Sequence, residues 1–254
     1  MKKILALIIT IFFLTNAYSA ESPDALNGAV NITGLISDSP NEYIAQLKQN
    51  AEIFEDLGST VAGVCIALSG NEVPGEMMLF NYSPSISVAF TSWGSNLTNR
   101  ATLRLRQELN QIRTLTGDLT FRVVVPYKGP LRETWAIRIL ELNTGNPAAY
   151  VNAASNLEAA YKANGFEDFD LEITQAIVAG SVPAYRSIAV APTLERLGAA
   201  FDALYSESWA QEAYTLVTSS RSAVVTDKLY TCLLYTSDAA DEGLGVDLGG
   251  RRII

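Results

Sequence analysis

Apolar positions along the chain follow two periods, which predict strands and helices in a repeating order. Runs rich in apolar and β-branched residues predict strands. In the first part of the chain these runs are Ala29 to Ile36, Val61 to Leu68, Met77 to Tyr82 and Leu119 to Val125. Apolar residues at helical spacing predict a helix over Ser39 to Gly58 and a second helical stretch, broken once, over Ser85 to Leu115.

The second part of the chain shows the same order. Strands are expected over Thr134 to Leu142, Phe169 to Ile177, Tyr185 to Ala191 and from Ala223 onward. Helices are expected over Asn146 to Gly165 and Thr193 to Thr218. The order β-α-β-β-α-β therefore occurs twice, and it is typical of a ferredoxin-like sheet.

Local signals mark the ends of the first helix of each part. Ser39 before Pro40, with Glu42 three residues after Ser39, predicts a capping box with proline in the first turn. Gly58 and Gly165 predict helix ends in the left-handed conformation.

Matched motifs at a constant spacing indicate an internal duplication. Pro40-Asn-Glu-Tyr43 and Pro147-Ala-Ala-Tyr150 are 107 residues apart, as are the two capping glycines. The common order and spacing predict two units, over residues 21–130 and 131–231.

The first residues have the pattern of a secretory signal peptide. Lys2 and Lys3 precede an apolar stretch over Ile4 to Leu14, and small residues surround a cleavage position near Ala20. The apolar stretch is shorter than a membrane span, so residues 1–20 predict export to the periplasm or the extracellular space.

The last residues, 232–254, resemble a translated sequencing adapter of the transposase type. Cys232 to Glu242 corresponds to one half of the adapter and Val246 to Ile254 to the other, with a short index between them. On this interpretation the natural sequence is cut after about Thr231, within its last strand.

The adapter interpretation also decides the expectation for the two cysteines. A secreted chain with Cys65 and Cys232 would suggest a disulfide. Because Cys232 is assigned to the adapter, Cys65 is expected to be a free, buried thiol and no disulfide is expected. Leu233 to Tyr235 are apolar enough to complete the last strand.

Composition narrows the possible chemistry. The chain has no histidine, which excludes Ser-His-Asp and Cys-His catalysis and histidine-ligated zinc or haem. Its net charge is −9 without a basic cluster, so neither a nucleic acid nor, after signal cleavage, a membrane is an expected partner. No metal site and no cofactor are expected.

The doubled element order resembles the dimeric α/β-barrel superfamily, which includes antibiotic-biosynthesis-type monooxygenases and stress-responsive barrel proteins. The resemblance covers about residues 29–231 and rests on topology. It implies an α+β fold of two tandem ferredoxin-like units, whose sheets face each other and carry helices on the outside. It supplies no catalytic motif.

Charged residues on strands are the first binding candidates. Arg122, Arg138 and Glu172 each alternate with apolar neighbours. If the apolar faces pack on helices, these three side chains point toward the opposing sheet, where they need partners or a polar ligand. The alternative to a ligand site is that these charges form inter-strand salt bridges or lie on a solvated sheet face. This alternative is favoured.

Aromatic residues form the second set of candidates. Trp93 and Trp209 fall in the second helical stretches, and Trp135 lies on a strand. The resemblance implies a Trp-, Tyr- and Asn-lined pocket in some members, for which Trp93, Trp135 and Tyr82 are the candidates. A structural role in the core is the favoured alternative.

Three functions remain open. The first is an exported small-molecule-binding or structural protein, the second a cofactor-independent monooxygenase for a small apolar molecule, and the third a self-associating interaction module. An apolar pocket reached by tryptophan and polar side chains favours the first two. A filled interior beneath an exposed apolar patch favours the third.

Overall fold

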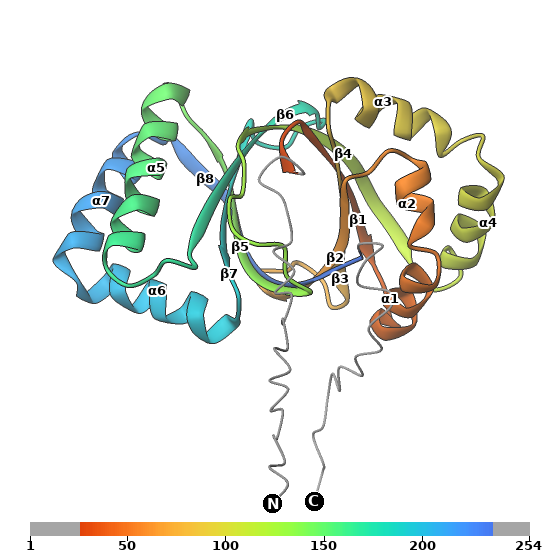
Figure 1. The fold of residues 1–254 in the computed structure, drawn as a ribbon, viewed down its shortest axis with the longest axis horizontal. Coiled ribbons are helices and arrows are strands. Elements are labelled where there is room, and N and C mark those ends of the chain that lie inside the picture. The colour runs from red at the N-terminus through yellow and green to blue at the C-terminus, as the bar shows by residue number, and fades with distance from the viewer. Residues whose placement is uncertain (1–25, 236–254) are drawn as a thin grey trace, which may run out of the picture.

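The computed structural model describes residues 26–235, which form a closed barrel of eight antiparallel strands with helices outside it (Figure 1). The signal-peptide prediction for residues 1–20 and most of the adapter-like segment lie outside the described residues. No helix within the described part of the chain has both the length and the apolar character needed to cross a membrane.

The elements follow the predicted order in two halves. The first half contains β1 (Ala29–Ile36), α1 (Pro40–Gln49), α2 (Glu52–Asp56), β2 (Val61–Ser69), β3 (Glu76–Ser83), α3 (Ile86–Ser95), α4 (Arg100–Leu109) and β4 (Thr114–Val125). The second half contains β5 (Thr134–Asn143), α5 (Pro147–Ala163), β6 (Asp170–Val178), β7 (Tyr185–Ala191), α6 (Leu194–Ser206), α7 (Ser208–Ser219) and β8 (Ala223–Leu234).

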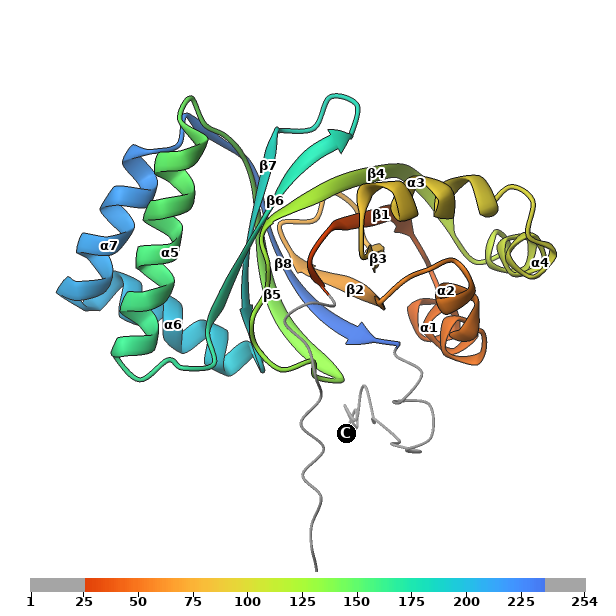
Figure 2. The ribbon, with the colours of Figure 1, turned by 45° about the horizontal axis from the view of Figure 1, so that its top comes forward.

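The barrel is assembled from one set of four strands per half. Around the ring the order is β4-β1-β3-β2 followed by β8-β5-β7-β6, which is the same arrangement in both halves. The pairs β2–β8 and β4–β6 join the halves and close the ring. The two helical layers lie on opposite outer sides of the barrel (Figure 2).

Three apolar clusters follow from this arrangement. One fills the barrel interior, around Phe80, Phe121, Ile137 and Tyr230. A second lies between α5–α7 and the outer face of the second half, around Tyr150, Tyr161 and Ile173. The third lies between α1, α2 and α4 and the outer face of the first half, around Tyr43, Leu47 and Leu109.

Several predicted helix boundaries are confirmed. Gly58 and Gly165 follow their helices with φ of 77° and 87°, a conformation that glycine adopts without steric cost. Asn146 caps α5, because its side chain accepts a hydrogen bond from the backbone N–H of Ala149. Tyr43 and Tyr150 are both buried on helices.

The first helix departs from the prediction at both ends. Ser39 makes no side-chain cap, so the predicted capping box is wrong; its backbone N–H donates instead to Ser37 Oγ. The helix also ends early, at Gln49. The Asn50 amide donates to the carbonyl of Gln46, a local side-chain bond that competes with continuing the helix, and a short second helix follows.

The helical stretch predicted to reach Leu115 is also too long. α4 ends at Leu109, and β4 already begins at Thr114, where it pairs with the end of β1. Pairing with a distant strand overrides the local helical pattern here, since Thr114 and Thr116 are β-branched and fit a sheet.

The expectation that Cys65 is unpaired is wrong in this structure, which contains a Cys65–Cys232 disulfide. The two residues face each other directly across the β2–β8 pair, which brings their side chains within bonding reach. Leu233 and Leu234 continue β8 and, with Tyr235, are buried, as expected from their apolar character. The adapter origin of residues 232–254 stays a prediction.

We expect Cys232→Ser to lower the free energy of unfolding by about 2–5 kcal/mol, because the bond links residues 167 positions apart and restricts the unfolded chain. Urea unfolding of the oxidised protein and the variant measures the difference. Reductant should destabilise the unmodified protein by a similar amount and leave the variant unchanged. An unmodified protein insensitive to reductant would contradict the disulfide.

Candidate functional site

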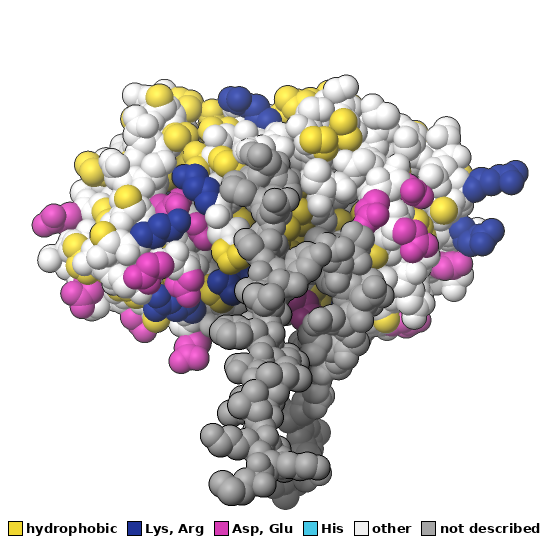
Figure 3. Space-filling view, viewed as in Figure 1, with side chains coloured by type: hydrophobic (Ala, Val, Ile, Leu, Met, Phe, Trp, Pro, Cys, Tyr) yellow, Lys and Arg dark blue, Asp and Glu magenta, His cyan; other side chains and the backbone are white. Residues whose placement is uncertain are grey.

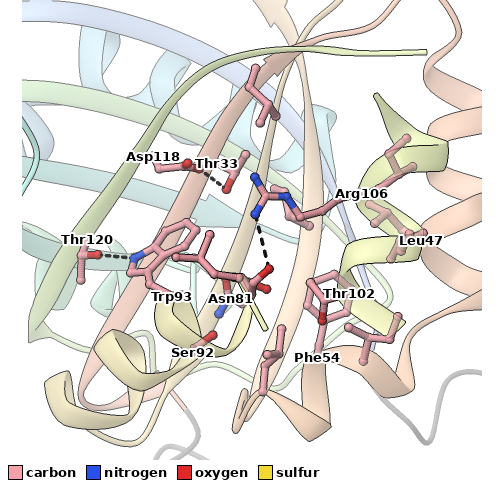
Figure 4. Close-up of a pocket in the computed structure, with 18 of the residues that line it drawn as sticks. Thr33, Leu47, Phe54, Asn81, Ser92, Trp93, Thr102, Arg106, Asp118 and Thr120 are labelled. Atoms are coloured by element: carbon pink, nitrogen blue, oxygen red, sulfur yellow. Dashed lines mark hydrogen bonds between the residues drawn. The ribbon is translucent and has the colours of Figure 1, made fainter. Parts of the chain in front are cut away.

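A cavity of about 540 Å³ lies between the helices of the first half and the outer face of β1, β3 and β4 (Figure 4). Its walls are mainly apolar, formed by Leu47, Phe54, Leu57, Leu79, Leu105 and Leu109. The volume is in the range of pockets that hold small organic molecules.

The cavity has an apolar rim. Phe90, Leu97, Leu115 and Val178 line it and are all exposed, with Leu97 at 68%. Val178 lies at the end of β6, so the second half contributes to the mouth of a cavity otherwise built by the first. Figure 3 shows apolar side chains gathered over α3, the helix that precedes Leu97. An entrance of this character suits a molecule with an apolar body.

Hydrogen bonds hold Trp93 in one wall of the cavity. The Trp93 Nε1–H donates to Thr120 Oγ1 at 2.9 Å, and the Thr120 hydroxyl donates to Asn31 Oδ1 at 2.8 Å. Asn31 in turn donates to the carbonyl of Ala89 on α3. This chain ties α3 to β1 and β4 and fixes the indole ring against the cavity.

Three charged side chains line the cavity: Arg106, Arg113 and Asp118. Asp118 Oδ1 accepts a hydrogen bond of 2.7 Å from Thr33 Oγ1, and Arg113 donates to Tyr43 Oη at 3.0 Å. The Arg106 guanidinium extends from α4 toward the sheet, near Thr33 and Trp93 (Figure 4). Its hydrogen bond to the carbonyl of Asn96 is a long one, 3.5 Å from Nη1 to the oxygen.

The corresponding space in the second half is filled. Only about 40 Å³ remains between α5–α7 and the sheet, because aromatic side chains occupy it: Tyr150, Tyr161, Phe169, Phe201 and Tyr214. Tyr161 alone contacts Phe166, Phe169 and Trp209. Two layers with the same strand order therefore differ between helices and sheet, where one is hollow and the other is packed. The larger opening of the second half, about 570 Å³, is a surface groove between α5 and the end of α7 that no strand residue lines.

The structure distributes the six sequence candidates over several places. Trp93 lines the large cavity, whereas Tyr82, Trp135 and Glu172 lie together inside the barrel, around a cavity of about 40 Å³. A cavity of that size has room for water but not for an organic substrate. These three side chains therefore belong to the barrel core.

Glu172 is the most unusual of these core residues. It is fully buried, and its Oε1 accepts a hydrogen bond of 2.7 Å from Tyr82 Oη. Burial away from water raises the pKa of Glu172 to about 7, although the bonds from Tyr82 and from the backbone of Tyr127 oppose the shift. Burial also raises the pKa of Tyr82 well above its usual value.

Arg138 and Arg122 lie on the outside of the barrel, contrary to the expected direction. On β5 the apolar face, with Trp135, points into the barrel, so Arg138 faces the helices. There it forms a bidentate ion pair with Asp227 on β8 and lies over the Phe201 ring. Arg122 is exposed and donates to Gln175. The alternative of inter-strand ion pairing is confirmed for Arg138.

Sequence reasoning missed Arg106, Asp118 and Thr102, which all line the large cavity. The apolar stripe of α4, Leu105 and Leu109, places Thr102 and Arg106 at the edge of its buried face. That periodicity was a usable signal. Asp118 gives no such signal, because it falls between the predicted helical stretch, which ends at Leu115, and the predicted strand, which begins at Leu119.

Solved structures share this fold at low sequence identity. A candidate monooxygenase from Lactobacillus acidophilus matches with a TM-score of 0.52 and 10% identity, over 83% of this chain and 95% of its own. A candidate monooxygenase from Fusobacterium nucleatum matches with a TM-score of 0.51 and 8% identity, over 83% and 95%. A dye-decolorizing peroxidase from Bacteroides thetaiotaomicron matches with a TM-score of 0.50 and 9% identity, over 88% and 96%.

These matches support the dimeric α/β-barrel resemblance at the level of the fold. No protein-family model matches the sequence, and no curated protein matches it.

The cavity has no side chain that could ligate the iron of a haem group. Haem iron is bound through histidine, cysteine, methionine or tyrosine side chains. None of these is among the side chains that line the cavity, and the sequence has no histidine. The side chains that line this cavity therefore offer no ligand for haem iron.

We expect Glu172→Gln to change how stability depends on pH. The folded pKa of Glu172 is raised to about 7, so between about pH 4.5 and 7 the folded protein holds a proton that the unfolded chain has lost. The stability of the unmodified protein therefore falls as pH rises through this window.

The free energy of unfolding of the variant should not fall in this window. Between pH 5 and 8 it should therefore rise by up to about 3 kcal/mol relative to that of the unmodified protein. Urea unfolding at pH 5, 6, 7 and 8 measures it, with the exposed Glu55→Gln as the matched control. Parallel pH profiles for all three proteins would contradict the raised pKa.

Proposed function

We propose that the cavity of the first half binds one small, largely apolar molecule. The observation that carries this proposal is the contrast between the two helix–sheet layers, about 540 Å³ open in one and about 40 Å³ in the other. Since an unfilled apolar cavity destabilises a fold, a large one in only one of two similar layers points to a ligand. The exposed apolar rim supports the same conclusion.

We propose further that the two halves are copies of one ferredoxin-like unit, which together form the barrel. The shared strand order and the spacing of the Pro-x-x-Tyr motifs support this proposal. Export rests on the pattern of residues 1–20 alone and is proposed on that basis.

Cofactor-independent oxygenation of the bound molecule is the second candidate function. Two structures of the same fold are described as candidate monooxygenases. In such a reaction an acidic CH2 group of the substrate loses a proton, the resulting carbanion gives electrons to O2, and a ketone and water are formed. Asp118 is the one carboxylate among the lining residues and could accept the proton.

A neutral fluorescent probe tests the binding proposal. N-phenyl-1-naphthylamine should bind with one site per chain, and its emission should rise in the apolar cavity. Leu79→Trp enlarges a half-buried wall residue into the empty space and should abolish the rise. Val225→Trp, at an exposed position of β8, serves as control and should leave binding unchanged. Equal binding by both variants would reject the cavity as the site.

Oxygen consumption tests the proposed activity. With 2-tetralone, which has an acidic CH2 group beside its carbonyl, the protein should consume O2 faster than the buffer alone. Asp118→Asn should lower this rate by about 10²- to 10⁴-fold, the usual contribution of a general base. Glu108→Gln, on the exposed side of α4, should leave the rate unchanged. A rate equal to that of buffer would leave binding as the only proposed function.

A further inference from the structure

We propose that the molecule bound in the first-half cavity carries a carboxylate group and that Arg106 is its anchor. The proposal rests on the binding function proposed above and specifies the chemical class of the ligand: an apolar body with one negative charge.

The position of Arg106 is the first observation. Arg106 is half-buried, and its guanidinium extends into a mainly apolar cavity, near Thr33 and Trp93 (Figure 4). No carboxylate of the described residues lies within ion-pairing distance of it, whereas Arg138, Arg186 and Arg196 each have such a partner. Because a cation in apolar surroundings is stabilised by a matching anion, Arg106 is poised for an external one.

The charge of the cavity agrees with this assignment. Its lining carries two arginines and one aspartate, a net positive charge, in a chain with a net charge of −9. Asp118 accepts a hydrogen bond from Thr33. Arg113 lies over the Tyr43 ring and donates a hydrogen bond to its hydroxyl. Of the three, Arg106 alone has neither an ion pair nor a side-chain partner among the described residues, since its one hydrogen bond is the 3.5 Å contact with the carbonyl of Asn96.

Thr102 provides an independent second observation. It lies one helical turn before Arg106 on α4, so both side chains are on the same face of the helix. Thr102 also lines the cavity, is 5% exposed, and its hydroxyl has no hydrogen-bond partner among the described residues. Thr102 and Arg106 therefore present a hydroxyl and a guanidinium on the same wall of the cavity, two donors that the oxygens of a carboxylate can accept from.

A pair of ligands with the same ring system, one charged and one neutral, tests the anchor. Isothermal titration calorimetry compares 2-naphthoate, ionised at pH 7, with 2-naphthalenemethanol, which has the same ring system. The unmodified protein should bind the carboxylate about 10- to 100-fold more tightly, the factor expected of a charge-assisted hydrogen bond. Arg106→Met should remove this preference by weakening naphthoate alone, and Arg106→Lys should restore part of it.

Two controls keep the outcome interpretable. Arg104→Met removes an exposed arginine of the same helix that does not line the cavity, and it should behave as the unmodified protein. Arg106→Gln keeps a polar side chain without the charge, and it replaces the methionine variant if that variant loses its cooperative thermal unfolding.

The possible failures are distinguishable. Equal affinity of the unmodified protein for both ligands, or a naphthoate preference that survives Arg106→Met, would overturn the carboxylate anchor and leave the cavity proposal standing. Binding of neither ligand, together with failure of the neutral fluorescent probe, would overturn the cavity proposal itself.

Discussion

Closure of the strand ring is the constraint on which the rest of this structure depends. Each half has two outer strands whose backbone groups need partners, and the pairs β2–β8 and β4–β6 supply them. Closing the ring removes the sheet edges and encloses one face of every strand. The opposite faces must then be covered from outside, which places the two helical layers.

The enclosed interior is not purely apolar, and its polar contacts connect the halves. Tyr82 on β3 bonds Glu172 on β6, and Lys228 on β8 pairs with Glu76 on β3 at 2.5 Å. Buried polar groups are costly unless they are paired, so these contacts favour one arrangement of the two halves over others. The cavity beside Tyr82 and Glu172 measures only about 40 Å³, which makes this pair part of the scaffold rather than of the ligand site.

The outer layers are where the halves diverge. In the second half, Tyr161 and its aromatic neighbours fill the space between helices and sheet. In the first half, the helix is broken at Asn50, and α3 is held by Trp93 and Asn31. The first layer is therefore held by its apolar cluster around Tyr43 and Leu109 and by the hydrogen bonds of α3, and it leaves a cavity between them.

The sequence by itself determined the element order and the helix-ending glycines, because these depend on local periodicity and backbone preference. The barrel-type fold class came from the resemblance that this element order carries. Strand alternation also predicted that Glu172 points toward the opposing sheet, and Trp93 was one of three aromatic candidates for a pocket, although a core role was favoured for them. Only the tertiary structure decided that Cys65 meets Cys232, that Arg138 faces the helices, and that Arg106 and Asp118 share a cavity. These outcomes depend on which strands become neighbours and which face of each strand is enclosed. Alternation along one strand gives two faces but does not say which of them the closed barrel will enclose.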